Sequence, residues 1–300
     1  MLRNLFYNFC PILGSEDISL DNVRRLERHW ATFNGRKVVV IKTGQGLLPP
    51  EAAEEMFERR NEIEFLRVQN DEVLHEVAGF VDTLRALYSL RRDEATFYAH
   101  NKGAGHKHST TSTGPISHRL PSDIDEAKNR LQGIRQWRNT LYDECLTDPQ
   151  RVDAALSTHA FAGCFLFKNP FRRHLESQWC FAGTFWWFRH DVLYASDWDK
   201  LPGDGNDRWG TEDYLGQKFP VEQAFSFYGE GLRMFYQGYQ IATCRCGVRY
   251  AKDVFRISKR LKPRCVRCRK CFVLSYPDRL PATFDPGLNP PPILPTYFDR

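Results

Sequence analysis

Long apolar stretches are missing from this sequence of 300 residues. The longest uninterrupted run covers residues 161–167, whereas a helix that crosses a bilayer needs about 20 apolar residues. The amino-terminal stretch 1–10 is short, contains Asn8 and lacks a small-residue cleavage site, so we interpret it as a buried strand and not as a signal peptide. The sequence therefore predicts a protein without a membrane span.

Several signatures of nucleotide binding and hydrolysis are also missing. Gly103-Ala-Gly105 lacks the third glycine of a dinucleotide fingerprint, and Gly44-Gln-Gly46 is not followed by the Gly-Lys-Ser/Thr of a P-loop. The sequence contains neither His-Glu-x-x-His nor Gly-x-Ser-x-Gly. Internal repeats are absent as well, so the residues offer no support for any of these enzyme classes or for a repeat architecture.

The composition is that of a folded chain with an uneven distribution of charge. Apolar residues make up 42% and charged residues 26%, which is enough apolar material for a substantial core and too little charge for a disordered chain. The net charge is +5, yet residues 244–271 hold eleven Lys or Arg and one acid, a net charge of +10 that leaves −5 for the rest. A mildly acidic body is thus joined to a small basic segment.

Strand-like and helix-like segments alternate through the first hundred residues. Residues 5–10, 38–42, 63–68 and 95–100 are short and rich in β-branched or aromatic side chains. Apolar positions recur every three or four residues over 20–33 and 73–87, and Pro49 and Pro50 begin a middle helix. The alternation predicts an α/β fold, a Rossmann-type and mostly parallel sheet flanked by helices, with ligands beyond the carboxyl ends of the strands.

The second hundred residues begin with a long polar loop, typical of a lid or a binding loop. Ser122 with Asp125 then resembles the capping box of a helix, whose apolar face carries Ala127, Leu131, Ile134, Leu141 and Cys145. Residues 161–167 predict one buried strand, and a short helix is expected from Asp191. Trp186 and Trp187 lie in an extended aromatic segment, so we expect one indole to face the core and the other a cleft.

The nine cysteines fall into two groups. Four are scattered among apolar neighbours, as buried thiols are: Cys10, Cys145, Cys164 and Cys180. The other five cluster near the carboxyl terminus: Cys244, Cys246, Cys265, Cys268 and Cys271. The odd total and the clustering favour a reducing, cytoplasmic location and a metal site over a disulfide framework.

The clustered cysteines have the spacing of a zinc site. Cys244-Arg-Cys246-Gly and Cys265-Val-Arg-Cys268 offer two pairs of thiolates that can close a tetrahedron around Zn²⁺. The pattern resembles the bacterial zinc-ribbon family, but Arg269 stands where a glycine commonly follows the second pair, and Cys271 competes as a ligand. We expect a structural zinc on Cys244, Cys246, Cys265 and Cys268, because so small a module with few apolar groups would hardly fold without metal.

The basic charge of this module leaves a second role open. A net charge of +10 suits nucleic-acid phosphate. Aromatic side chains for base stacking are scarce, however, with only Tyr250 and Phe255 in the segment. Lysine and arginine also commonly solubilise a small module, so nucleic acid is the less favoured partner.

The segment Trp209-Gly210-Thr211-Glu212-Asp213 combines an indole with two adjacent carboxylates. Aromatic faces stack on pyranose rings, and a carboxylate can accept the proton of an attacking hydroxyl. Together with the strand-end block Phe181-Ala-Gly183-Thr184 and the short helix between, the order resembles galactosyltransferase-type enzymes of the GT-A fold. The resemblance implies that Asp213 is the catalytic base and that Glu212 holds the acceptor. The alternative is a solvated helix start, where acids favour the dipole.

Further motifs resemble an uncharacterised bacterial and viral glycosyltransferase-like family over about residues 4–225. The shared marks are Tyr98-x-His100-x-Lys102-Gly103, Trp137-Arg138 and the block from Phe181 to Trp187. The resemblance implies that a nucleotide-sugar donor binds near His100, Lys102 and Arg138. It also implies an acceptor site that includes Gly183, Thr184, Trp186 and Trp209.

The donor site departs from the usual GT-A pattern. Most such enzymes hold a divalent cation with Asp-x-Asp, but His100-Asn-Lys102 stands at that position. The leaving diphosphate still needs positive charge, which Lys102, His100 and Arg138 would supply. The alternatives are a cation held by acids such as Asp204 or Asp207, or a fold that has lost catalysis. Lys102 could equally be an ordinary solvated lysine, and His106 and His108 are either a metal pair or part of a polar loop.

The sequence thus predicts a glycosyltransferase-like domain over residues 1–240, a zinc ribbon over 243–275 and a proline-rich tail over 276–300. The expected activity is inverting, nucleotide-sugar-dependent transfer of a hexose to a glycan or another hydroxyl acceptor. Two alternatives remain open. One is a catalytically degenerate glycosyltransferase-fold protein that only binds a glycan or nucleotide, and the other is a nucleic-acid-associated zinc-ribbon protein.

Overall fold

A computed structural model describes residues 1–71, 77–101, 103, 124–168, 177–181, 183–201, 210–228, 239–243, 249–253 and 273–275, with the backbone alone for 124–131 and for the strands after residue 238. The chain forms two compact units. The first joins Met1–Lys107 with Leu141–Leu232, and the second joins His108–Thr140 with Arg233–Arg300. Helix α4 (Ile124–Leu146) contributes to both units.

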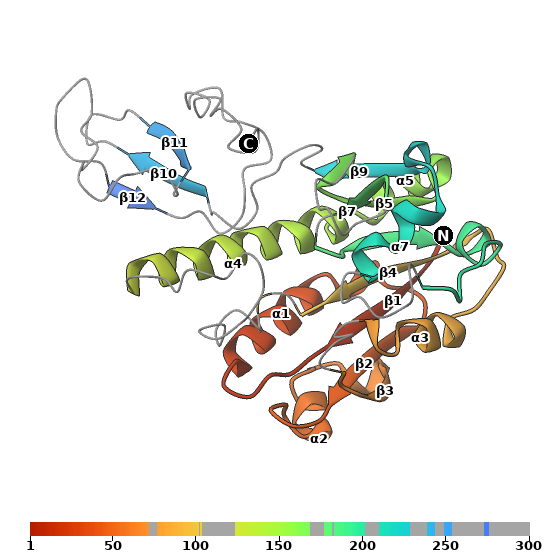
Figure 1. Cartoon of the computed structure of the whole chain (residues 1–300), viewed down its shortest axis with the longest axis horizontal. Coiled ribbons are helices and arrows are strands. Elements are labelled where there is room, and N and C mark those ends of the chain that lie inside the picture. The colour runs from red at the N-terminus through yellow and green to blue at the C-terminus, as the bar shows by residue number, and fades with distance from the viewer. Residues whose placement is uncertain are drawn as a thin grey trace. The chain divides into compact units, whose positions relative to one another are not determined.

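A seven-stranded sheet forms the centre of the first unit, in the order β3-β2-β1-β4-β8-β5-β9 (Figure 1). Strand β8 is antiparallel to both of its neighbours, and the other described pairs of this sheet are parallel. The strands are β1 (Leu2–Phe9), β2 (Lys37–Thr43), β3 (Glu64–Gln69), β4 (Glu94–His100), β5 (Phe161–Cys164), β8 (Trp186–Arg189) and β9 (Ala224–Tyr228). The predicted α/β fold with a mostly parallel sheet is confirmed.

Helices connect most of these strands and flank the sheet. They are α1 (Glu16–Arg28), α2 (Pro50–Glu54), α3 (Phe80–Ala86), α5 (Pro149–Thr158), α6 (His190–Leu193) and α7 (Gly210–Lys218), with short 3-10 turns at Trp30–Thr32, Arg60–Glu62 and Val221–Gln223. The four strands predicted in the first hundred residues are confirmed, as is the helix that begins at Pro50. The prediction of one helix over 73–87 is wrong in its extent: α3 begins only at Phe80, because Gly79 before it has a φ of 76°, and residues 72–76 lie outside the described residues.

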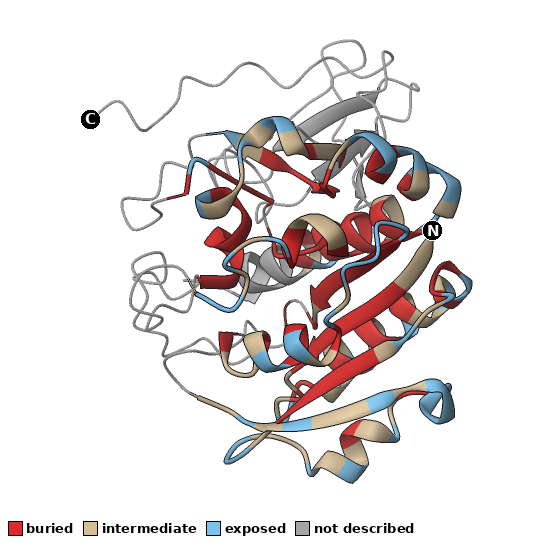
Figure 2. Ribbon diagram, turned by 90° about the vertical axis from the view of Figure 1, so that its right-hand side faces the viewer, coloured by how far each residue is buried: buried red, intermediate tan, exposed pale blue. Residues whose placement is uncertain are grey.

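Aromatic side chains fill the layers on both faces of the sheet. On one face Tyr98 packs against Trp186, with ring centroids 5.0 Å apart, and against Phe80, at 5.1 Å. On the other face Trp187 packs against Phe97, at 5.2 Å, and against Phe33, at 5.9 Å. Figure 2 shows the inner strands in red and the edge strand β3 in tan and pale blue. Strands β1, β2 and β4 are covered on both faces, so most of their residues are buried, including polar ones such as Asn8 and Thr96.

The prediction of one strand over residues 161–167 is wrong. The chain forms β5 and then β6 (Leu166–Lys168), separated by Phe165, whose φ is 54°. A left-handed residue turns the chain out of the sheet, and β6 pairs with β7 (Trp179–Phe181) in a separate two-stranded ribbon. The aromatic segment that follows is also broken, by a turn at Gly183 and Thr184 between β7 and β8.

The second unit contains a three-stranded antiparallel sheet with the order β11-β10-β12. Its strands are β10 (Tyr239–Thr243), β11 (Arg249–Asp253) and β12 (Val273–Ser275). At one end Thr243 of β10 pairs with Arg249 of β11 and with Val273 of β12. The five clustered cysteines lie outside the described residues.

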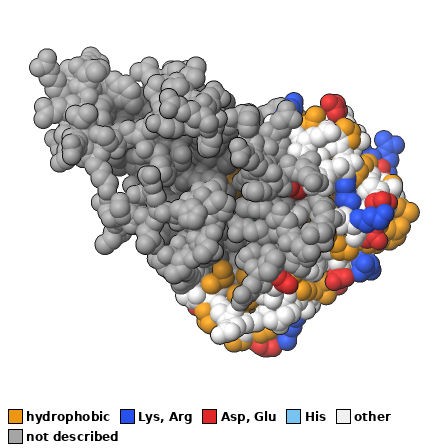
Figure 3. Space-filling model, viewed as in Figure 1, with side chains coloured by type: hydrophobic (Ala, Val, Ile, Leu, Met, Phe, Trp, Pro, Cys, Tyr) orange, Lys and Arg blue, Asp and Glu red, His pale blue; other side chains and the backbone are white. Residues whose placement is uncertain are grey.

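Two observations concern binding partners: the distribution of charge on the described surface and the length of the described helices. In the view of Figure 3, basic and acidic side chains are mixed on the coloured part of the surface, in keeping with ion pairs such as Arg36–Glu64 at 2.7 Å and Arg67–Glu54 at 2.8 Å. Within the described ranges, no helix has both the length and the apolar character needed to cross a membrane.

Candidate functional site

The carboxyl ends of β1 and β4 lie side by side, although β2 and β3 come between them in the sequence. Asn8 pairs with His100 in the parallel register. One residue further on, the Asn101 side chain accepts from the Cys10 amide at 2.9 Å and donates to the Cys10 carbonyl at 2.7 Å. Such a reversal of strand order is a topological switch point, the usual place for ligands in open α/β sheets.

A strained turn approaches this point from β8. His100 donates from Nε2 to the carbonyl oxygen of Gly183, at 3.1 Å. Gly183 and Thr184 both have positive φ, at 89° and 61°. This conformation is ordinary for glycine but rare for a β-branched residue, and such strain often marks functional sites. The structure therefore brings together three residues of the predicted donor and acceptor sites.

The two predicted catalytic carboxylates lie in the first turn of α7. Glu212 is 9% exposed and Asp213 is 3% exposed. Acidic side chains are rarely buried unless they have partners, and Asp213 has one in Ser177, whose hydroxyl donates to Oδ1 at 2.6 Å. A solvated helix start would leave both carboxylates in water, so that alternative is wrong.

Helix α7 is held against β7 by an unusually close approach of backbones. A Cβ atom added to Gly216 would lie 1.6 Å from the carbonyl oxygen of Trp179, so only glycine fits here. The Gln178 amide donates to the Gly216 carbonyl at 3.2 Å, and the Trp179 indole donates to the Phe219 carbonyl at 2.7 Å. These contacts fix the position of the helix turn that carries Glu212 and Asp213.

The predicted aromatic acceptor residues are placed differently. Trp186 is 1% exposed and belongs to the core. Trp187 lies on the opposite face, as alternation predicts, and donates from its indole to the Cys145 carbonyl at 2.9 Å. The expectation that one of the two indoles faces a cleft is wrong, because side chains cover both faces of β8.

The remaining predicted residues divide between the second unit and the undescribed segments. Arg138 lies in the second unit on α4, where it is 3% exposed and donates from Nε and Nη2 to the Asn139 side chain at 3.2 and 3.0 Å. The residues outside the described ranges are Lys102, Asp204, Asp207, Trp209, His106, His108 and the five clustered cysteines. Among the described residues, no three His, Cys, Asp or Glu side chains are grouped so as to hold a metal.

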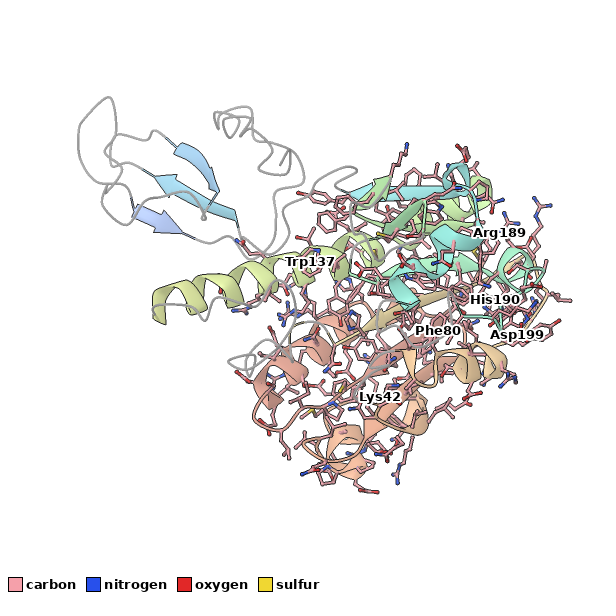
Figure 4. All side chains as sticks on the ribbon, in the orientation of Figure 1. Lys42, Phe80, Trp137, Arg189, His190 and Asp199 are labelled. Carbon is pink, nitrogen blue, oxygen red and sulfur yellow. The ribbon has the colours of Figure 1, made fainter. Side chains whose placement is uncertain are left out.

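Sequence reasoning missed two polar residues of this region, Ser177 and Lys42. Lys42 is the last residue but one of β2, is fully buried (labelled in Figure 4), and donates to the Ala78 carbonyl. Burial raises the pKa of the nearby Cys10 thiol to about 11, although the charge of Lys42 acts to lower it. Cys10 is therefore a protonated thiol at neutral pH and a poor nucleophile. A lysine at the end of an apolar strand is a weak signal that could have identified Lys42.

Comparison with known proteins identifies no relative. No protein-family model matches the chain, and no curated protein matches it significantly.

Proposed function

We propose that the first unit is an inverting, nucleotide-sugar-dependent glycosyltransferase. The observation that carries this proposal is the burial of Glu212 and Asp213 in the first turn of α7. Keeping two adjacent carboxylates out of water is costly, and an ordinary helix start gives no reason for it. A general base beside an acceptor-binding carboxylate is such a reason, because removal of water strengthens the interaction of both groups with a sugar hydroxyl.

In the proposed reaction Asp213 takes the proton from the acceptor hydroxyl. The hydroxyl oxygen forms a bond to the anomeric carbon of the donor, while the bond from that carbon to the diphosphate oxygen breaks on the opposite side of the sugar. The electron pair of the broken bond leaves with the nucleoside diphosphate. Glu212 hydrogen-bonds a second hydroxyl of the acceptor and so orients it for attack.

The donor is proposed to lie at the carboxyl ends of β1 and β4. Their reversed order supports this, as does the GT-A-like sheet with its single described antiparallel strand. His100 orients the turn at Gly183 and Thr184 through its hydrogen bond at 3.1 Å. We assign the counter-charge of the leaving diphosphate to Lys102, which follows His100 by two residues.

The direct test is release of nucleoside diphosphate from a panel of nucleotide sugars, with and without simple glycan acceptors. We expect one donor to be turned over and Lys102→Ala to weaken binding of the nucleoside diphosphate, since loss of a desolvated charge pair costs about 2–5 kcal/mol. EDTA should leave that binding unchanged. Strong sensitivity of this binding to EDTA would mean that a divalent cation, and not Lys102, neutralises the charge of the diphosphate.

A degenerate binding protein is the second candidate. The observation in its favour is that His100-Asn-Lys102 replaces the acidic metal motif of most GT-A enzymes. The same panel separates the two proposals, because a binding protein would take up a nucleotide sugar or glycan without releasing nucleoside diphosphate.

For the second unit we propose a structural zinc. The register supports it, because Thr243 pairs with Val273 and with Arg249 at one end of the three-stranded sheet. Cys244 directly follows Thr243 in the sequence, and Cys271 precedes Val273 by two residues, so the described residues nearest in sequence to the two groups of cysteines are paired with each other. Purified protein should hold about one zinc per chain. Cys244→Ser and Cys265→Ser should lose the zinc, and Cys271→Ser should keep it. If Cys265→Ser keeps the zinc and Cys271→Ser loses it, the second pair of ligands is Cys268 and Cys271.

A further inference from the structure

We propose that Ser177 is a positioning residue for Asp213. It belongs to the segment just before β7, which none of the motifs described above includes. Its hydroxyl donates to Oδ1 of Asp213 across 36 positions of sequence, at 2.6 Å. The proposal rests on the proposed function, since a base needs positioning only if Asp213 acts as one.

The length and burial of this bond make it a strong one. An O–H···O distance of about 2.5–2.7 Å is typical of a hydroxyl that donates to an ionised carboxylate. Both side chains are buried, with Ser177 6% and Asp213 3% exposed, so water competes little for either partner. The bond therefore restricts rotation of the Asp213 carboxyl group and holds its plane in one orientation.

The backbone around Ser177 is itself anchored along α7. Gln178 donates to the Gly216 carbonyl at 3.2 Å and Trp179 to the Phe219 carbonyl at 2.7 Å. Ser177 and Gln178 thus bind α7 at Asp213 and Gly216, and the Trp179 indole binds the chain just after the helix, at Phe219. At the other end of β7, the Gly183 carbonyl accepts from His100 at 3.1 Å. One short segment therefore ties the proposed base to the carboxyl end of β4.

The hydrogen bond also bears on the charge of Asp213. A donor to a carboxylate favours its ionised form, which is the form that a base needs. The neighbouring Glu212 acts in the opposite direction, because like charges disfavour each other. Other titratable or charged side chains lie on α7 and on the described elements next to it. They include Cys180 on β7, Asp82 and Arg85 on α3, Tyr194, Asp197, Asp199 and Lys200 before the helix, and Tyr214 and Lys218 within it.

The first experiment measures the pKa of the Asp213 carboxyl directly, by carbon NMR titration of the full chain with Asp213→Asn for assignment. Loss of a hydrogen bond to the ionised carboxylate disfavours that form, so Ser177→Ala should raise this pKa by about one unit or more. Ser177→Thr keeps a hydroxyl and should restore the original pKa. Ser196→Ala is the matched control, because it removes a hydroxyl that donates to the Leu193 carbonyl at 2.7 Å.

The second experiment measures transfer. Ser177→Ala should lower kcat about 10-fold with little change in KM for the donor, and the acid limb of kcat/KM should move by the same amount as the pKa. If Ser177→Ala does not fold, Ser177→Cys retains a weak donor and should shift the pKa by an intermediate amount.

The outcomes separate the two proposals. An unchanged pKa of Asp213 in both Ser177→Ala and Ser177→Cys overturns the positioning role, whether or not the protein transfers sugar. A raised pKa, restored by threonine, supports it. If the pKa rises but the wild-type protein turns over no nucleotide sugar, the hydrogen bond is real and the transferase proposal is the one that fails.

Discussion

The two ends of strand β4 show what packing does with the same residue type. At each end a histidine links β4 to the chain next to β8: His190, which follows β8, at one end and His100, which belongs to β4, at the other. His190 follows β8 and reaches Thr96 at the amino end, with 2.7 Å between Nε2 and Oγ1. His100 ends β4 and reaches Gly183, which precedes β8, at 3.1 Å. Two antiparallel neighbours are thus joined by a histidine at each end.

The amino end is a buried polar cluster in which His190 Nδ1 has no hydrogen-bond partner among the described residues. His190 Nδ1 lies 3.7 Å from Glu94 Oε1, and the same oxygen accepts from the Asn4 side chain at 2.8 Å. Threonine, histidine and glutamate in this order look like a nucleophilic triad, but Thr96 and His190 are fully buried and no substrate can reach them. Figure 4 shows His190 beside Arg189 and away from Lys42, which lies near the carboxyl end of β2.

The carboxyl end differs in exposure and in backbone strain. His100 is half-buried, and its acceptor belongs to a turn in which Thr184 has a φ of 61°. A polar cluster that is fully buried acts on the stability of the fold, whereas strain beside a half-exposed titratable group is typical of a binding site. We therefore expect changes at the carboxyl end to affect activity and changes at the amino end to affect stability.

The largest expected effect is that of Asp213→Asn, in the first turn of α7. The substitution keeps the size of the side chain and removes its basicity, so transfer should slow by at least about 100-fold. Folding, zinc content and donor binding should be unchanged, as measured by circular dichroism, metal analysis and calorimetry.

Glu212→Gln sharpens this prediction, because it should raise KM for the acceptor more than it lowers kcat. If Glu212→Gln abolishes turnover while Asp213→Asn retains it, the roles of the two carboxylates are reversed. If neither substitution matters, the buried pair is structural and the binding-protein alternative gains support.

The next largest effect is expected for Gly216→Ala. A Cβ atom at this position would lie 1.6 Å from the Trp179 carbonyl, so α7 must move away from β7, at a cost of about 2–3 kcal/mol. Gly210→Ala is the matched control in the same helix, because its Cβ would meet only Val77 at 3.4 Å. Urea unfolding should show a large loss for the first variant and a small change for the second; equal losses would contradict the close approach.

The third prediction concerns pH and the amino end. Burial lowers the pKa of His190 to about 4, although Glu94 and Asp191 act to raise it. The unfolded chain takes up a proton near pH 6.5 and the folded chain does not, so the free energy of unfolding falls as the pH drops from 6.5 towards 4. Between pH 7 and pH 5 the loss should be about 2 kcal/mol.

Two variants test this source of pH dependence. His190→Gln should flatten the dependence, because glutamine does not titrate, whereas His159→Gln, at a half-buried histidine next to Thr158, should leave it intact. An unchanged slope in His190→Gln would mean that the network at the amino end is not the proton-linked element.

The smallest effect is expected for His100→Ala. One hydrogen bond to a backbone carbonyl is lost from a half-buried position, which should lower the free energy of unfolding by about 1 kcal/mol at pH 7. Donor affinity should fall as well, because the turn at Gly183 and Thr184 loses its tether. If His100→Ala lowers the free energy of unfolding more than His190→Ala does at the same pH, the two ends of β4 do not differ in the way proposed.

Much of the fold was predictable because local patterns determine it. The first four strands, β1 to β4, are short segments rich in β-branched or aromatic residues. They alternate with segments in which apolar positions recur at helical spacing, and this alternation is typical of a parallel sheet flanked by helices. The break at Phe165 was not predictable, because a positive φ at a phenylalanine has no sequence signal. It follows from the pairing of β6 with β7, which is a long-range contact.

The candidate site was predictable only where a motif carried it. Glu212 and Asp213 were identified from their neighbours in sequence, and the structure adds their burial. Ser177 was not identified, because a lone serine before a tryptophan matches no pattern and its partner lies 36 positions away. Trp186 was expected at the acceptor site, but alternation gives only the face of a strand and not what covers that face.

The close contact between Gly216 and Trp179 adds one residue to the sequence motif with which distant relatives of this chain can be sought. A side chain at position 216 would separate the helix from β7, so any protein that builds its carboxylates on the same helix–ribbon contact needs glycine three residues after the second acid. The search pattern then becomes Trp-Gly-x-Glu-Asp-x-x-Gly, as in residues 209–216 here. A sequence with the acids but without that last glycine would have to support them by a different architecture.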